Sequence, residues 1–147
     1  MKITLSIDST ETIALNLADA ANIVSWIDDD EKYAPFFSLL AERPSSGVRC
    51  VPASKCCVPI KVLKQLARDS SIEVVRTVAS NETALKKFKV SLIQEMIARD
   101  VSVAMAVADS LIFVGEELHE EVIQTLLQHD DPKVVETAES FVQGRVA

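Results

Sequence analysis

Three cysteines stand close together in the chain and are the residues best suited to metal or redox chemistry. Cys56 and Cys57 are adjacent, and Cys50 lies six residues earlier. A structural zinc or iron–sulfur site needs one more ligand than these three and usually a regular ligand spacing, while His119 and His129 are far away in the sequence. Small buried apolar cysteines are the simpler interpretation. A metal-responsive or redox-responsive protein is therefore our third hypothesis of function.

Signatures of other enzyme chemistry are missing from the sequence. The chain has only three glycines, which excludes most glycine-rich phosphate-binding loops, and it has no nucleophile elbow. His119 stands in an acidic stretch and is expected to be an ordinary surface histidine. The acidic stretch would cap a helix, because carboxylates are favourable at the positive end of the helix dipole; its members are Glu116, Glu117, Glu120 and Glu121. We expect a protein with no catalytic residues, no metal site and no cofactor.

The charged residues divide the chain into an acidic, a basic and a second acidic part. Residues 1–42 carry eight acidic and two basic side chains, residues 43–90 carry three and ten, and residues 91–147 carry eleven and three. The net charge is −7, yet a local basic surface can attract and orient an acidic partner. The basic part predicts a partner-binding strip made of two groups of residues. The first group, Lys61, Lys64 and Arg68, falls at helical spacing on one face, and the second group, Lys86, Lys87 and Lys89, is expected to open the following helix.

Two further interpretations of this basic strip remain open. A solvated helix face that balances its acidic neighbours would carry the same residues. A nucleic-acid-binding protein would also use such a strip, but the acidic ends of this chain would repel the phosphate backbone on either side. We expect another protein with an acidic surface as the partner, and nucleic acid is the alternative.

The composition predicts that helices hold these residues in place. Apolar residues make up 48% of the 147 residues and aromatic residues only 5%, with three glycines and five prolines, which favours helices over β-turns. The apolar residues also recur at helical spacing. The clearest such pattern is Leu85, Phe88, Leu92, Ile93, Met96 and Ile97. We predict an all-α fold in a chain long enough for one compact domain.

The beginning of the chain follows a different pattern. Apolar and polar residues alternate over residues 3–7, which predicts a short extended arm. Asp8 and Glu11 stand three residues apart before an apolar pattern over residues 13–27, so they are expected to cap a helix. We assign residues 1–42 to this arm and to capping helices.

A short phrase recurs through the remainder of the chain. It is clearest over residues 66–81 and returns with changes over residues 40–51, 97–103 and 127–138. A spacing of about 26 to 31 residues indicates stacked structural repeats, here over residues 43–147. The phrase also ends in Asn81, which would suit the left-handed position after a helix.

Two arginines stand at matching places in the first two copies of the phrase. We expect each to pair with an acidic residue at its own turn, Arg76 with Asp69 and Arg49 with Glu42. A role in partner binding is the alternative. Exposed pairs of this kind contribute about 0 to 1 kcal/mol.

The phrase also resembles a known repeat. Leu66-Ala67-Arg68-Asp69, followed by Val74 to Ala79 and Ser80-Asn81, is similar to the leucine-rich-variant repeat and its relatives in the HEAT-like superfamily. The third copy has Met105, and the fourth has Glu136, where those repeats place arginine. The resemblance implies a right-handed α-solenoid of about four helix pairs that binds other macromolecules and has no family-wide catalytic residues.

These observations together predict a non-catalytic scaffold or adaptor. No apolar run reaches the length of a membrane span and no signal peptide is recognisable at the start, so we expect a cytoplasmic protein, of bacterial type, with no membrane contact. A homodimer remains open, either through the acidic ends and the basic middle or through edge strands at residues 3–7.

Overall fold

Helical periodicity along the sequence becomes a series of short helices in the computed structural model, which describes residues 4–7 and 11–146. The predicted all-α fold is confirmed for this part of the chain, apart from one small hairpin of strands β1 (Thr4–Ile7) and β2 (Glu11–Ala14). The helices are α1 (Leu17–Ser25), α2 (Ala34–Leu40), α3 (Ser46–Ser54), α4 (Ile60–Leu66), α5 (Ile72–Ala79), α6 (Glu82–Lys87), α7 (Val90–Ile97), α8 (Val101–Asp109), α9 (His119–Leu127) and α10 (Pro132–Val146). Short 3₁₀ turns occupy Glu31–Tyr33, Leu111–Phe113 and Glu116–Leu118.

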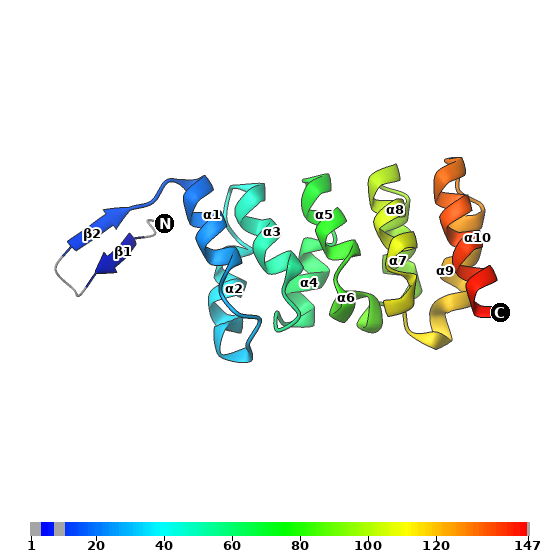
Figure 1. Cartoon of the computed structure of the whole chain (residues 1–147), viewed down its shortest axis with the longest axis horizontal. Coiled ribbons are helices and arrows are strands. Elements are labelled where there is room, and N and C mark those ends of the chain that lie inside the picture. Colours follow the sequence, from blue (N-terminus) through cyan, green and yellow to red (C-terminus); the bar gives the residue numbers. More distant parts are fainter. Residues whose placement is uncertain (1–3, 8–10, 147) are drawn as a thin grey trace.

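The helices form two layers along the long axis of the molecule (Figure 1). In one layer α1, α3, α5, α8 and α10 contact one another in that order. The other layer contains α2, α4, α6, α7 and α9, and these pack against the first layer. Each helix is too short to be stable alone, so the buried aliphatic side chains between the layers hold the structure. The fully buried side chains include Phe37, Leu63, Leu66, Leu85, Phe88, Ile93, Met96 and Leu126.

The N-terminal segment differs from the expectation. Residues 4–7 are extended as predicted, but they pair with β2 in antiparallel register, with Ile7 opposite Glu11. Glu11 therefore lies in a strand and caps no helix, and Asp8 lies outside the described residues. Helix α1 begins at Leu17, because the Asn16 side chain accepts a hydrogen bond from the Asp19 N–H at 2.9 Å. The β-branched residues Thr12 and Ile13 favour the strand.

The long apolar pattern of residues 85–97 is interrupted in the structure. Helix α6 ends at Lys87, Phe88 and Lys89 are extended, and α7 begins at Val90. The interruption lets Phe88 turn into the core, where it is 1% exposed. One predicted helix is therefore two.

Asn81 begins a helix, so the prediction that it closes one in the left-handed conformation is wrong. Its φ is −88°, and its side-chain oxygen accepts the Ala84 N–H at 3.0 Å. The side-chain amide also donates to the carbonyl oxygens of Ala53 and Lys55, at 2.9 and 3.1 Å. Asn81 is 3% exposed, and it both caps α6 and joins the start of α6 to the end of α3.

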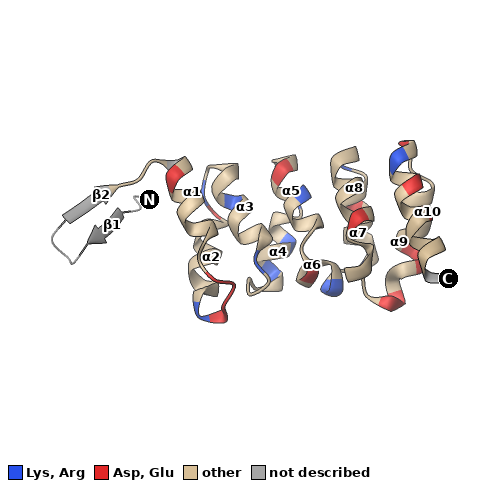
Figure 2. Cartoon of the chain, in the orientation of Figure 1, with Lys and Arg blue, Asp and Glu red and all other residues tan. Residues whose placement is uncertain are grey.

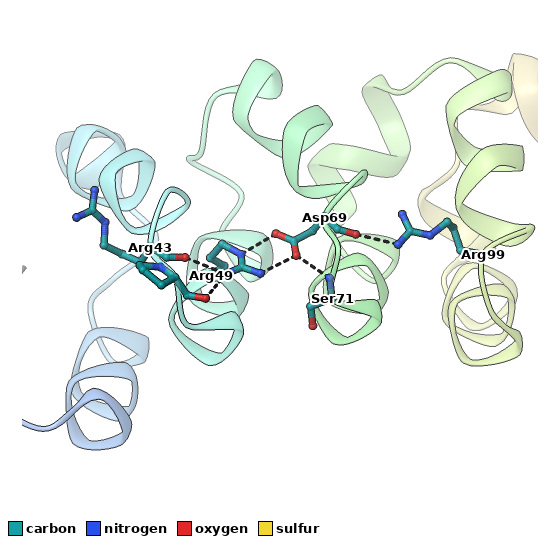
Figure 3. Close-up of polar contacts among 6 residues, drawn as sticks. Arg43, Arg49, Asp69, Ser71 and Arg99 are labelled. Atoms are coloured by element: carbon teal, nitrogen blue, oxygen red, sulfur yellow. Dashed lines mark hydrogen bonds and ion pairs between the residues drawn. The ribbon is translucent and has the colours of Figure 1, made fainter.

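A ladder of hydrogen bonds joins three successive turns (Figure 3). Nε and Nη2 of Arg49 donate to the two carboxylate oxygens of Asp69, at 2.7 and 2.8 Å, and Nη1 donates to the carbonyl oxygens of Arg43 and Pro44. Arg99 donates to the Asp69 carbonyl oxygen at 2.9 Å. The hydrogen bonds from Arg49 hold the pKa of Asp69 below its ordinary value, although burial acts in the opposite direction.

The predicted pairs of Arg76 with Asp69 and of Arg49 with Glu42 are both wrong. Asp69 faces the preceding turn, and its partner is Arg49 of α3. Arg49 is the fourth residue of α3, whereas Arg76 is the fifth residue of α5. Since neighbouring helix positions point about 100° apart, the two arginines face different ways. An alignment by residue type alone does not reveal this offset of one residue between the two helices.

Candidate partner-binding surface

The predicted basic strip lies on the layer that contains α4, α6 and α7 (Figure 2). Lys61 and Lys64 lie within α4, and Arg68 follows its end. Helix α4 contacts α6, so the second group of lysines lies on the neighbouring element. That group does not open one helix as expected: Lys86 and Lys87 end α6, and Lys89 precedes α7.

Two members of the basic strip have acidic partners. Arg68 makes two hydrogen bonds to Glu95, at 3.0 and 2.8 Å, and Lys86 pairs with Glu82 one helical turn earlier. Both pairs are about half exposed, so they contribute little to stability. The remaining lysines make no ion pair with any residue that the structure describes; they are Lys61, Lys64, Lys87 and Lys89. Their charges are therefore available to a partner.

The cysteine cluster has the geometry of a structural contact. The Asp29 carboxylate accepts the backbone N–H groups of Cys56 and Cys57, at 2.6 and 2.7 Å, and so joins this loop to the segment after α1. Burial, and then the nearby Asp29, raise the pKa of the Cys57 thiol to about 11, and burial raises the pKa of Cys50. Protonated thiols are poor nucleophiles and poor metal ligands.

No group of three or more cysteine, histidine or acidic side chains is placed to hold a metal ion within the described part of the chain. Cys56 is exposed, while Cys50 and Cys57 are half-buried. Among the described residues, the three cysteines therefore do not form a metal-ligand set.

His119 is buried, which corrects the expectation of a surface histidine. Its side chain is 8% exposed, its Nε2 lies 3.1 Å from the carbonyl oxygen of Leu111, and its ring meets the Phe141 ring edge to face. The residue fastens α9 to the irregular segment before it and to α10. Its acidic neighbours remain exposed at the start of α9.

An apolar pocket borders the basic strip and was missed in the sequence. Helices α8 and α9 are separated by residues 110–118, and this long connection leaves a cavity of about 470 Å³ against α6 and α10. The sequence analysis did not identify this long connection, although its length was a usable signal. The lining residues are Lys86, Ile112, Phe113, Val114, Gly115, Glu116, His119 and Phe141.

A second groove, of about 600 Å³, lies on the other layer between α5 and α8. Arg76 lines it, and no described residue forms a hydrogen bond or ion pair with this arginine. The equivalent fifth positions of the neighbouring helices differ in chemistry. They are Cys50 in α3, Met105 in α8 and Glu136 in α10. This face therefore has no repeated charge pattern.

Exposed apolar side chains also escaped the sequence analysis. Trp26, the single tryptophan, is 86% exposed at the end of α1, and Ile112 is 71% exposed beside the apolar pocket. Trp26 precedes the acidic run Asp28-Asp29-Asp30-Glu31. A lone tryptophan two residues before an acidic run was the signal available in the sequence.

Comparison of the chain with protein-family models, with curated proteins and with solved structures finds no match. Among the described residues, no helix combines the length and the apolar character that a bilayer span requires.

Proposed function

We propose that this protein is a non-catalytic scaffold, a right-handed α-solenoid of about four HEAT-like or leucine-rich-variant-like helix pairs, that binds an acidic protein partner. The binding surface is the basic strip of α4, α6 and α7. The observation that carries the proposal is the contact between α4 and α6, which joins two groups of lysines from different repeats.

The charges on this surface favour an acidic partner over a purely structural role. Lysines used for internal stability would be paired, as Arg68 is with Glu95, yet four members of the basic strip have no described acidic partner. Unpaired charges on one face raise the rate of encounter with a surface of opposite sign. The two-layer row of helices offers a long, rigid support for such a contact.

The test is a charge-reversal variant in which Lys64, Lys87 and Lys89 are replaced by glutamate. Each reversal changes the charge by two units, so the net charge falls from −7 to −13. We expect the wild-type protein to retain a partner in affinity purification that the variant loses, with an unchanged melting temperature.

The matched control reverses Arg76 and Lys133 and is compared with the reversal of Lys87 and Lys89 alone, so that both variants change the net charge equally. Arg76 and Lys133 are exposed, make no ion pair with a described residue and lie outside the basic strip. Loss of the partner in both variants would show an effect of net charge alone and would contradict the proposal. Retention in both would contradict it as well.

Nucleic acid is the other class of partner that this surface could bind, and one experiment separates the two. Phosphate contacts weaken steeply with salt, so a nucleic-acid-binding strip would shift labelled DNA or RNA in a gel at low salt and lose it at higher salt. If the wild-type protein shifted the nucleic acid and the charge-reversal variant did not, the partner of the basic strip would be a nucleic acid and not a protein.

A further inference from the structure

The exposed Trp26 and the apolar pocket beside Lys86 have complementary chemistry. We propose that Trp26 of one molecule inserts into the pocket of a second copy, while the acidic residues after it face the basic strip. The chain would thus associate head to tail with itself. This inference rests on the proposed function, because it names an acidic partner for the same basic strip.

The pocket has the walls that an aromatic side chain requires. Phe113 and Phe141 contribute aromatic surface, and Ile112 adds an aliphatic side chain that is mostly in water. Its volume of about 470 Å³ falls within the roughly 300 to 1,000 Å³ of sites that hold small organic ligands. An inserted indole would cover Ile112 and contact the rings, as buried aromatic anchors do at protein interfaces.

The pocket and the basic strip form one continuous surface. Lys86 is a member of both, and the loop that forms the pocket contacts α6. A Cβ built on Gly115 would lie 3.7 Å from the carbonyl oxygen of Lys86, so the loop passes close to the end of α6. An anchor in the pocket therefore has Lys86 beside it, and Lys87 and Lys89 follow within three residues along the chain. Lysine beside an indole ring also adds a cation–π attraction.

The segment around Trp26 supplies the opposite charges. Asp28 and Glu31 are exposed, and their carboxylates make no hydrogen bond or ion pair with a described residue. Asp29 is held by the cysteine loop and Asp30 by Lys32, so these two fix the course of the segment. Glu116, at the edge of the pocket, would repel carboxylates and direct them toward the lysines.

Trp26 cannot fill the pocket of its own molecule. Helix α1 lies at one end of the row of helices, and the pocket lies near the opposite end, against α10 (Figure 1). Two different surfaces that bind each other between copies make a heterologous contact, which continues from one molecule to the next. The contact builds chains or rings where each molecule binds a new neighbour, and it closes as a two-fold dimer where each Trp26 fills the other molecule's pocket.

The test uses two variants that each remove one half of the contact, Trp26→Ala and Ile112→Asp. Both side chains are strongly exposed, so neither change should affect folding. We expect the wild-type protein to gain mass with concentration in sedimentation equilibrium over an about hundredfold range, and each variant to remain a monomer. Mixing the variants should give a heterodimer and nothing larger, because only one intact contact is left.

Intrinsic fluorescence provides an independent reading, because Trp26 is the single tryptophan. Its emission should shift to shorter wavelength as the protein concentrates and should return in higher salt, since screening weakens the charge contacts. Val101→Asp is the matched control, because Val101 is 45% exposed at the start of α8, outside both surfaces. It should assemble as the wild-type protein does.

A monomeric wild-type protein would overturn the self-association and leave the partner capture by the basic strip unaffected. Assembly that persists in Trp26→Ala, or a mixture of the two variants that stays monomeric, would overturn it too. The proposed function fails separately, through the charge-reversal pull-down.

Discussion

The contact between Arg49 and Asp69 is the internal polar contact whose removal we expect to cost most. The two side chains are 13% and 9% exposed, and the carboxylate also accepts the Ser71 N–H at 2.8 Å. Replacement of Asp69 by alanine removes the negative charge and the two carboxylate acceptors of the largely buried Arg49 guanidinium, which keeps only the carbonyl oxygens of Arg43 and Pro44. Removing one partner of such a pair costs about 3 kcal/mol.

That loss of free energy should be measurable in two ways. We expect Asp69→Ala to lower the free energy of unfolding by about 3 kcal/mol in urea and the melting temperature by about 6 to 12 °C. Circular dichroism of the helices follows both transitions. A double-mutant cycle with Arg49→Met should give a coupling energy of at least about 1 kcal/mol, because each change removes the same interaction.

Arg76→Met is the control, since repeat alignment by sequence assigns Asp69 to Arg76. The structure predicts a change within about 0.5 kcal/mol for this exposed residue. A large loss in Arg76→Met together with a small one in Arg49→Met would refute the ladder and restore the sequence-based pairing. A cost of less than about 0.5 kcal/mol for Asp69→Ala would refute the reasoning itself.

The pH dependence of the same pair has a defined sign. The pKa of Asp69 is lowered in the folded protein from an ordinary value of 3.8, so its contribution is complete above that value. The contribution is lost as the pH falls through the lower, folded pKa. The stability difference between the wild type and Asp69→Asn should therefore be constant near neutral pH and shrink below the ordinary carboxyl value.

Three further predictions concern contacts between repeats. Asn81→Gly should destabilise the protein by about 2 kcal/mol in urea, because it removes three hydrogen bonds at a buried site; a neutral result would support the left-handed position. Cys57 should resist a thiol reagent at pH 7.5 while the exposed Cys56 reacts. The reactivity of Cys57 should rise as the pH approaches its pKa of about 11, as mass spectrometry of the labelled peptides would show. Equal labelling of the two cysteines at pH 7.5 would contradict this. Lys55→Met should speed hydrogen exchange in α1, because the Lys55 ammonium donates to the carbonyl oxygens of Ser25 and Ile27; unchanged exchange there would contradict the contact.

The elements that the sequence predicted best are those whose signal is local. Proline at the first position of α10, with Asp131 accepting the Lys133 N–H, follows from residues only two apart. The turn at Asp100 is equally local, because its side chain accepts the Ser102 N–H. The prediction for Asn81 failed because its side chain bonds to Ala53 and Lys55, which are remote in the sequence. The prediction for Glu11 failed because Asn16 caps the helix instead.

At the candidate site, too, local features were readable in the sequence and long-range contacts were not. The composition of the basic strip was readable in the sequence, since lysines at helical spacing share a face. Which of these charges are free was not readable, because Glu95 is 27 residues from Arg68 along the chain. The apolar pocket was hidden for the same reason, as Phe113 and Phe141 meet only when α10 packs beside the connection that precedes α9.

The sequence by itself determined that the chain is mainly helical and that its basic residues gather in the middle, because periodicity and charge depend on neighbours within a few residues. Only the tertiary structure decided that Arg49 reaches across to the next turn, that Phe88 breaks a continuous pattern, and that Trp26 remains in water. Those outcomes depend on which repeat lies beside which and on one residue of helix register. A shift of one residue along a helix rotates a side chain by about 100° around the helix axis. Because of this rotation, Arg49 belongs to the hydrogen-bond ladder while Arg76 is exposed.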